Sequence, residues 1–246
     1  MRRTATILRV LAVAAALACG PLSAAATPRT AQDPAPRKAA PVHTAALTPG
    51  MQHIAAWAVH SRDHKGLPFI IIDKLNARAA AFDRTGKVVQ STPVLLGMGV
   101  GDRFPPELAN VDMYATSPAQ RITPAGRYAA EEGINLEREA VLWIDYDFGI
   151  ALHKMPAKKT KQRRHERMLS PDPAQHRITY GCVNVPPAFY DRVVRPHFKE
   201  KGGIVYVLPD SAPVKSVFNS YDVDPSILHT AGGPRTTSGA VPPERF

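Results

Sequence analysis

Cys182 is the side chain with the clearest potential for chemistry, and it lies in the stretch HRITYGCVNVP, His176 to Pro186. A thiol reacts as a nucleophile in its thiolate form, which requires a nearby base or positive charge and some access to solvent. Gly181 permits a tight turn in which backbone N–H groups can point at a developing oxyanion. Cys182 is therefore a nucleophile, half of a disulfide, or a buried small apolar residue.

The only other cysteine, Cys19, follows an N-terminal segment that is typical of a secretory signal peptide. Arginines precede the apolar run 10–18, and small residues at A-x-A spacing follow it. We predict that residues 1–26 form a signal peptide whose removal also removes Cys19, so that no internal disulfide can form. A lipid attached to Cys19 is the alternative.

The charge of the chain suits an anionic neighbourhood outside the cytoplasm. The formal net charge of +10 falls to +7 without the three arginines of residues 1–26, which hold no acid. No later stretch reaches the roughly 20 apolar residues of a transmembrane helix. We therefore expect an exported protein of the periplasm or cell envelope, with no integral membrane segment and no nucleic acid as partner.

A base for the thiol must come from elsewhere in the fold. His153 ends the apolar run GIALH, which reads as a strand, so its ring would lie at a strand end. His165 and His176 are the alternative bases, and both are nearer to Cys182 in the sequence.

The elements that must position these residues are mostly strands. A short helix is predicted from Thr48 and Pro49 through Val59, from its N-cap and apolar spacing. A second helix is predicted over 186–198. The predicted strands are 68–73, 77–83, 87–97, 140–146, 149–153 and 202–209.

The segments between these strands have different characters. Thr123, Pro124 and Gly126 predict a turn within a polar connection, Ile122 to Tyr128. The segment 154–177 is rich in Lys and Arg, so we expect it to be a solvent-exposed loop.

These residues together resemble the catalytic domain of the L,D-transpeptidase (YkuD-like) family. The family motif is a histidine at a strand end, a variable loop, then Ser/Thr-x-Gly-Cys-apolar-Asn/Arg. This chain has His153 in IALHKMP and then Thr179-Tyr180-Gly181-Cys182-Val183-Asn184. The similarity extends in order over about 67–209, through PFIIIDKLNARAAAFDRTGKVV, PVLLGMG, ITPAGRY, PAFYDRVV and GGIVYVL.

The resemblance implies a mostly β fold, an L,D-transpeptidase-like β-sandwich or barrel with short helices. It implies the following organisation: signal peptide 1–26, Pro/Ala-rich tether and short helix 27–66, catalytic domain 67–209, and C-terminal tail 210–246.

The resemblance also implies acyl transfer on the stem peptides of peptidoglycan. Cys182 would attack a stem tetrapeptide with His153 as general base, and an amine would resolve the thioester. The acceptor would be a neighbouring stem or an envelope protein, and no metal or other cofactor is implied. The residues implied to form the oxyanion site, shape the cysteine loop or bind a substrate carboxylate are Tyr180, Gly181, Thr179, Asn184 and Arg177. A peptidoglycan hydrolase and a non-catalytic wall-binding protein are the alternatives.

Two features depart from the family pattern. Tyr180 stands where many relatives have histidine, and the loop between His153 and Cys182 is longer than usual and very basic. One hypothesis is that this loop is a lid whose charge attracts substrate carboxylates, through Lys158, Lys159, Arg163 and Arg164. The other is that it is only a solvated loop.

Overall fold

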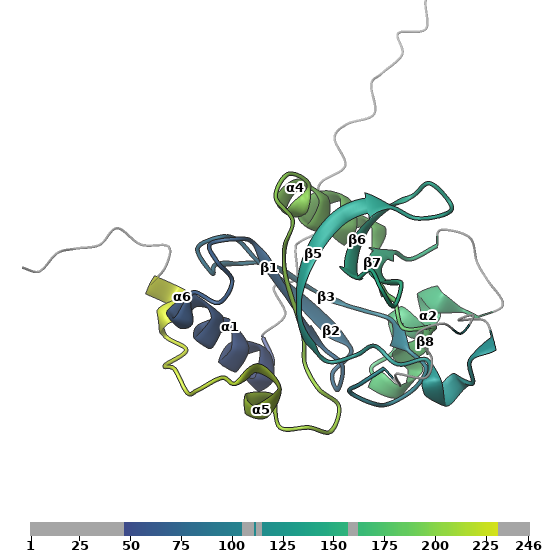
Figure 1. Cartoon of the computed structure of the whole chain (residues 1–246), viewed down its shortest axis with the longest axis horizontal. Coiled ribbons are helices and arrows are strands. Elements are labelled where there is room, and N and C mark those ends of the chain that lie inside the picture. The colour runs from purple at the N-terminus through teal and green to yellow at the C-terminus, as the bar shows by residue number, and fades with distance from the viewer. Residues whose placement is uncertain (1–46, 105–110, 112–114, 157–161, 231–246) are drawn as a thin grey trace, which may run out of the picture. The chain divides into compact units, whose positions relative to one another are not determined.

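The computed structural model describes residues 47–104, 111, 115–156 and 162–230 (Figure 1). The predicted signal peptide, the tether before residue 47 and the end of the predicted tail lie outside these residues, so their predicted roles stay predictions.

An eight-stranded mixed sheet forms the centre of the described part. Its order is β3 (Val88–Pro93), β2 (Arg78–Phe82), β1 (Phe69–Asp73), β10 (Gly203–Val207), β5 (Gly126–Ile134), β6 (Ala140–Asp145), β7 (Ile150–Lys154) and β9 (Val183–Val185). The pairs β1–β10 and β7–β9 are parallel, and the others are antiparallel. The prediction of a mostly β fold with short helices is confirmed.

The two ends of the sheet almost meet. Leu95, just beyond β3, exchanges two backbone hydrogen bonds of 2.9 Å with Asn184 of β9. Beside this bridge, β4 (Leu96–Gly97) pairs in parallel with β8 (Arg177–Thr179). The near closure therefore places the segment that carries Cys182 against the end of the first meander.

The first three strands form the meander that the sequence predicts. The alanines of β2 favour helix by propensity, yet Ala79, Ala80 and Ala81 are buried in the sheet. Their small side chains are flanked by β1 and β3, and this packing outweighs the local preference.

The prediction of a polar connection over 122–128 is wrong in its second half, because β5 begins at Gly126 and runs to Ile134. This strand lies between β10 and β6. Its sequence GRYAAEEGI buries only Ala130, so it lacks the apolar alternation that signals a strand. Backbone hydrogen bonds to the strands on both sides, and not a pattern of buried apolar side chains, stabilise β5.

Helix α1 (Pro49–Ser61) confirms the predicted N-terminal helix. The Thr48 side chain accepts a hydrogen bond from the Met51 N–H, and Arg62 ends the helix in the left-handed region. Its buried face packs on β1, β2 and β10, as Figure 1 shows for β1. The apolar surface buried there stabilises one face of the sheet.

The predicted helix over 186–198 forms as one irregular rod of α3 (Pro187–Phe189), η5 (Tyr190–Val194) and α4 (Arg195–Phe198). The middle segment is a π-helix. Pro196 follows it, and a proline has no N–H to continue the α-helical ladder. The other helices are η3 (Pro118–Gln120), α2 (Arg164–Met168), η4 (Pro173–His176), α5 (Val214–Phe218) and α6 (Ile227–Thr230).

The prediction that 154–177 is a solvent-exposed loop is wrong for part of this segment. Met155 and Met168 are buried with Leu95 and Ile178 in a small apolar cluster, and His176 is buried as well. Because so many residues of this segment are charged, the sequence did not indicate that Met155, Met168 and His176 are buried. The segment is therefore attached to the domain close to the cysteine.

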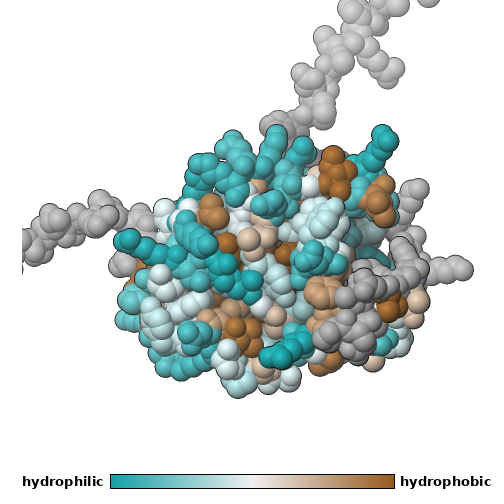
Figure 2. Space-filling model, in the orientation of Figure 1, coloured by the Kyte–Doolittle hydropathy of each residue, from teal (hydrophilic) through white to brown (hydrophobic). Residues whose placement is uncertain are grey.

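The surface is mainly hydrophilic on the face drawn in Figure 2, with apolar residues in separate spots. Within the described ranges, no helix is long and apolar enough to cross a membrane.

Candidate active site

Two neighbouring parallel strands position the histidine and the cysteine of the motif. In the β7–β9 register, His153 pairs with Asn184, and Leu152 pairs with Val183 in the core. Side chains alternate along strands, so His153 and Asn184 share the face opposite to that core. Cys182 precedes β9 by one residue and lies two positions before Asn184, about 6.6 Å along the strand. The fold therefore brings Cys182 and His153 to one place.

The Cys182 side chain is partly exposed and rests against β7. Its Sγ lies 3.5 Å from the Gly149 carbonyl oxygen, to which the thiol donates. Burial raises the pKa of this thiol. The rise is partly offset by the backbone N–H of Ala151, the charge of Arg164 and the backbone N–H of Cys182 itself. The resting side chain is therefore a neutral thiol that needs a base.

A chain of hydrogen bonds defines the tautomer of His153. Asn184 Oδ1 accepts from Arg164 Nη1 at 2.6 Å, so Asn184 Nδ2 is the atom that donates to His153 Nε2, at 2.9 Å. His153 Nδ1 then carries the proton and donates to the Lys154 carbonyl oxygen at 3.0 Å. Nε2 is thus the acceptor nitrogen that a general base requires.

The charge state of His153 is consistent with that role. Burial lowers the pKa of the imidazole, the Lys154 carbonyl raises it in part, and the Arg164 charge lowers it further. The resting pair is therefore a neutral imidazole beside a neutral thiol, so the proton must move during the attack.

Thr179 and Gly181 shape the cysteine loop. Thr179 Oγ1 donates to the Cys182 carbonyl oxygen at 2.6 Å and accepts from the Gly181 N–H at 3.2 Å. Gly181 has φ +130°, and a Cβ there would come within 2.7 Å of the Ile122 carbonyl oxygen. Thr179 thus hydrogen-bonds across the cysteine loop, and the Gly181 N–H is engaged inside it, while the implied roles of both residues stay predictions.

Thr123 supports this loop from the opposite side, and the sequence assigned it only to a turn. The buried Thr123 hydroxyl donates to the Gly181 carbonyl oxygen at 2.8 Å and accepts from the Gly97 N–H at 2.9 Å. The Thr123 carbonyl oxygen accepts from Lys74 Nζ at 2.9 Å. The Thr-Pro-x-Gly pattern is the signal that could have pointed to it.

Tyr180 and Arg177 lie at the edges of the site. The Arg121 guanidinium lies 3.9 Å from the centre of the Tyr180 ring. Arg177 donates to Asp210 Oδ1 at 2.5 Å and to the Gly99 carbonyl oxygen at 3.0 Å. Arg177 therefore ties β8 to the segment after β10.

The alternative bases occupy different environments. His165 is exposed on α2. His176 is buried with Nδ1 2.8 Å from the Val94 carbonyl oxygen and Nε2 3.0 Å from that of Ser170. Both of its ring nitrogens are therefore engaged with backbone carbonyl oxygens and are not open to the thiol.

In the sequence, Arg164 is only one of four cations of the lid hypothesis, and the structure connects it to the reactive pair through Asn184. It is half-buried, its Nη1 donates to Asn184 Oδ1, and its charge acts to lower the pKa of the Cys182 thiol. Its position at the start of a five-residue helix has no distinct sequence signal. Of the other residues in the lid hypothesis, Lys158 and Lys159 lie outside the described residues.

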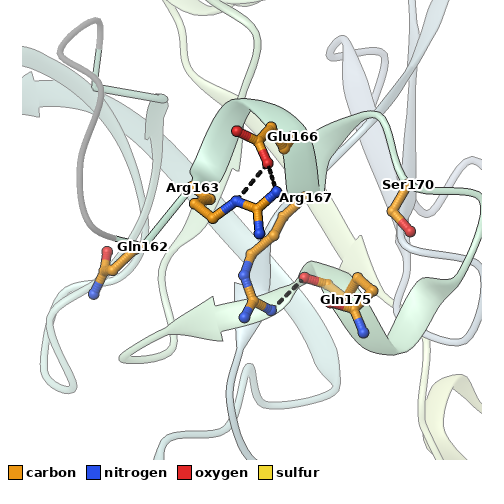
Figure 3. A pocket seen from close by; sticks show the side chains of 6 residues that line it. All are labelled: Gln162, Arg163, Glu166, Arg167, Ser170 and Gln175. Atoms are coloured by element: carbon orange, nitrogen blue, oxygen red, sulfur yellow. Dashed lines mark hydrogen bonds and ion pairs between the residues drawn. The ribbon is translucent and has the colours of Figure 1, made fainter.

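A polar surface pocket of about 290 Å³ lies next to α2 (Figure 3). Its lining residues are Gln162, Arg163, Glu166, Arg167, Ser170 and Gln175. Neither Cys182 nor His153 lines it, so this hollow is separate from the reactive pair. Across the described ranges, no group of three or more His, Cys, Asp or Glu side chains could hold a metal ion.

The fold and the site together define a class: a mostly β domain with a histidine on one strand and a cysteine directly before the adjacent parallel strand. No protein-family model matches the chain, and no curated protein matches it.

Several solved structures resemble the fold at low identity. The Ldtfm–avibactam carbamoyl enzyme is 19% identical with a TM-score of 0.35, over 57% of this chain and 48% of that one. The catalytic domain of the E. faecium L,D-transpeptidase is 20% identical, TM-score 0.33, over 57% and 95%. The helical cell shape determining protein Pgp2 from Campylobacter jejuni is 14% identical, TM-score 0.38, over 59% and 49%. The chain thus spans about half the length of two of these three structures.

Proposed function

We propose that this chain is a peptidoglycan L,D-transpeptidase that acts by cysteine acyl transfer. The observation that carries the proposal is the pairing of β7 with β9, which sets His153 opposite Asn184, two residues after Cys182, with His153 Nε2 as a hydrogen-bond acceptor. The stretch Thr179 to Asn184, with a glycine in a conformation that excludes other residues, supports it.

The first half-reaction forms a thioester. Cys182 Sγ attacks the carbonyl carbon of the donor peptide while its proton passes to His153 Nε2. The amide C–N bond then breaks, and the departing amine takes the proton back from the imidazolium. Because Nε2 accepts from Asn184 at rest, Asn184 must give up this bond when the thiol approaches.

The second half-reaction consumes the thioester. An amine from a neighbouring stem peptide or an envelope protein attacks the thioester carbonyl, His153 accepts a proton from it, and the C–S bond breaks to return the thiol. Water in place of the amine would make the enzyme a hydrolase. The Ala151 and Cys182 N–H groups near the sulfur supply positive polarity at the reacting centre.

The proposed location is the periplasm or cell envelope. The N-terminal signal sequence and the charge of +7 that remains without residues 1–26 support export to an anionic wall.

The test is mass spectrometry of the purified protein after incubation with a carbapenem, which resembles the acyl donor. We expect an adduct on the wild type and none on Cys182→Ala. His153→Asn should acylate at least about 100-fold more slowly, because a positioned base contributes 10²–10⁴-fold. The matched control His165→Asn, an exposed histidine, should acylate like the wild type.

Products from a disaccharide tetrapeptide then separate the activities. A cross-linked dimer indicates transfer, and a shortened monomer indicates hydrolysis. Absence of both products and of the carbapenem adduct in the wild type would leave the non-catalytic wall-binding protein as the function.

A further inference from the structure

Arg163 and Arg164 are neighbours in the sequence but lie in different surroundings. Arg163 is exposed, forms an ion pair with Glu166 and borders the pocket of Figure 3. Arg164 is half-buried, and its Nη1 donates to Asn184, whose amide nitrogen donates to the candidate base His153. The chain therefore places one of two adjacent guanidinium groups at the residues that hold the reactive pair.

Arg164 has neutral partners where it is buried. Nη1 donates to Asn184 Oδ1 at 2.6 Å and Nε donates to Gln162 Oε1 at 2.7 Å. Among the residues that the structure describes, no carboxylate lies within ion-pair distance of it. The guanidinium also has more N–H groups than these two bonds use.

Three other shielded cations of the described residues are paired with acids, whereas the partly buried Arg78 and Arg167 donate to neutral oxygens. Arg127 contacts Asp63 at 2.6 Å, and Arg177 contacts Asp210 at 2.5 Å. Lys74, fully buried, contacts Asp210 at 3.2 Å. A half-buried cation whose partners are neutral loses hydration that their hydrogen bonds replace only in part, so an incoming anion binds it favourably.

The position of Arg164 limits what that anion can be. The attacked carbonyl carbon must come within about 3–3.5 Å of Cys182 Sγ. A carboxylate on the residue beyond the scissile amide, or on the side chain of the residue before it, lies only a few bonds from that carbon. A planar guanidinium matches the two oxygens of such a carboxylate.

We propose that Arg164 binds a carboxylate of the acyl donor and selects donors that carry it beside the scissile bond. This inference rests on the proposed acyl-transfer function. It differs from the lid hypothesis because a single guanidinium, and not the summed charge of the loop, recognises the substrate.

The experiment compares three tetrapeptide donors on the full-length protein. One has both carboxylates free, one has the C-terminal carboxylate as an amide, and one has the side-chain carboxylate as an amide. For wild type we expect kcat/KM to fall about 10- to 100-fold for the amide that removes the recognised group, as for a lost hydrogen bond to a charged group. The amide that matters identifies which carboxylate Arg164 binds.

The same comparison with Arg164→Gln tests the residue. We expect similar kcat/KM values for all three donors, because the guanidinium that distinguishes them is gone. Arg164→Lys, which keeps the charge without the planar fork, should retain an intermediate preference. The matched control Arg163→Gln, one residue away and exposed, should keep the wild-type preference.

A purely structural role for Arg164 would slow all donors equally and leave their ratio unchanged. An unchanged ratio in Arg164→Gln, or no preference in the wild type, overturns the inference while the acyl-transfer function stands. Failure of wild type to form product or a carbapenem adduct overturns both.

Discussion

Two shielded cations of this molecule, Lys74 and Arg164, differ in the groups that they contact. Lys74 is fully buried and donates to the Gly101 and Thr123 carbonyl oxygens, with Asp102 at 3.1 Å and Asp210 at 3.2 Å. Arg164 is half-buried and contacts only amide oxygens among the described residues. The first charge is neutralised by the fold, whereas the second is left for a ligand.

The difference separates the support of the site from its chemistry. Lys74, Asp102 and Asp210 form the Lys74 cluster. Lys74 binds the carbonyl oxygen of Thr123, whose hydroxyl holds the Gly181 carbonyl oxygen. Asp210 binds both Lys74 and Arg177. The groups of this cluster are satisfied, so removal of one should destabilise the domain. Arg164 has N–H groups that its two hydrogen bonds do not use, so its removal should change reactivity more than stability.

The largest expected effect comes from Lys74→Met. It leaves Asp102 and Asp210 without their common cation, which should lower the free energy of unfolding by about 3–5 kcal/mol. Urea denaturation followed by circular dichroism measures this. Lys87→Met, an exposed lysine in the β2–β3 turn, is the control and should change stability by less than about 0.5 kcal/mol. Equal effects of the two variants would contradict the contrast.

Thr123→Val should have the next largest effect. Valine keeps the shape but leaves the buried Gly97 N–H and Gly181 carbonyl oxygen without their hydroxyl partner, which should cost about 1–3 kcal/mol. We also expect slower carbapenem acylation, since Gly181 precedes the nucleophile. Thr123→Ser, which keeps the hydroxyl, should restore most of the acylation rate.

The pH dependence of thiol alkylation tests the neutral resting pair. Burial raises the pKa of Cys182 and lowers the pKa of His153, so the thiolate population should grow with pH throughout the neutral range. The iodoacetamide rate should rise about tenfold per pH unit between about pH 6 and 8. A plateau starting near pH 6 would instead indicate a preformed thiolate–imidazolium pair.

Acid should weaken the Lys74 cluster by a smaller amount. Burial acts to raise the pKa of Asp102, but N–H groups of Ala212, Asp210 and Ser211 and the Ser211 hydroxyl together hold it well below its usual value. A depressed pKa in the folded state adds stability above the unfolded value of about 3.9, and this is lost as the pH falls below it. Asp102→Asn should reduce the loss of stability between pH 5 and pH 3 in urea titrations.

Local signals were enough to predict several elements. Thr48 and Pro49 mark the start of α1, and β1 and β10 are short apolar runs bounded by turn residues. Cys182 could be selected because it is the only cysteine beyond residue 19 and follows a glycine, whereas the choice of His153 depended on the resemblance to a family motif with a histidine at a strand end. The strand β5 was not predicted because pairing with its neighbouring strands stabilises it, and its own sequence lacks the alternation of apolar residues that indicates a strand.

The amino-acid sequence specifies which chemical groups are present: one cysteine beyond residue 19, a histidine after an apolar run and a basic segment between them. Which charges are neutralised depends on the fold. Arg163, Arg164 and Arg177 are alike in the sequence, but they contact Glu166, Asn184 and Asp210 respectively. A charge acquires its role from its burial and its partners, and for Arg164 and Arg177 these come from residues distant in the chain.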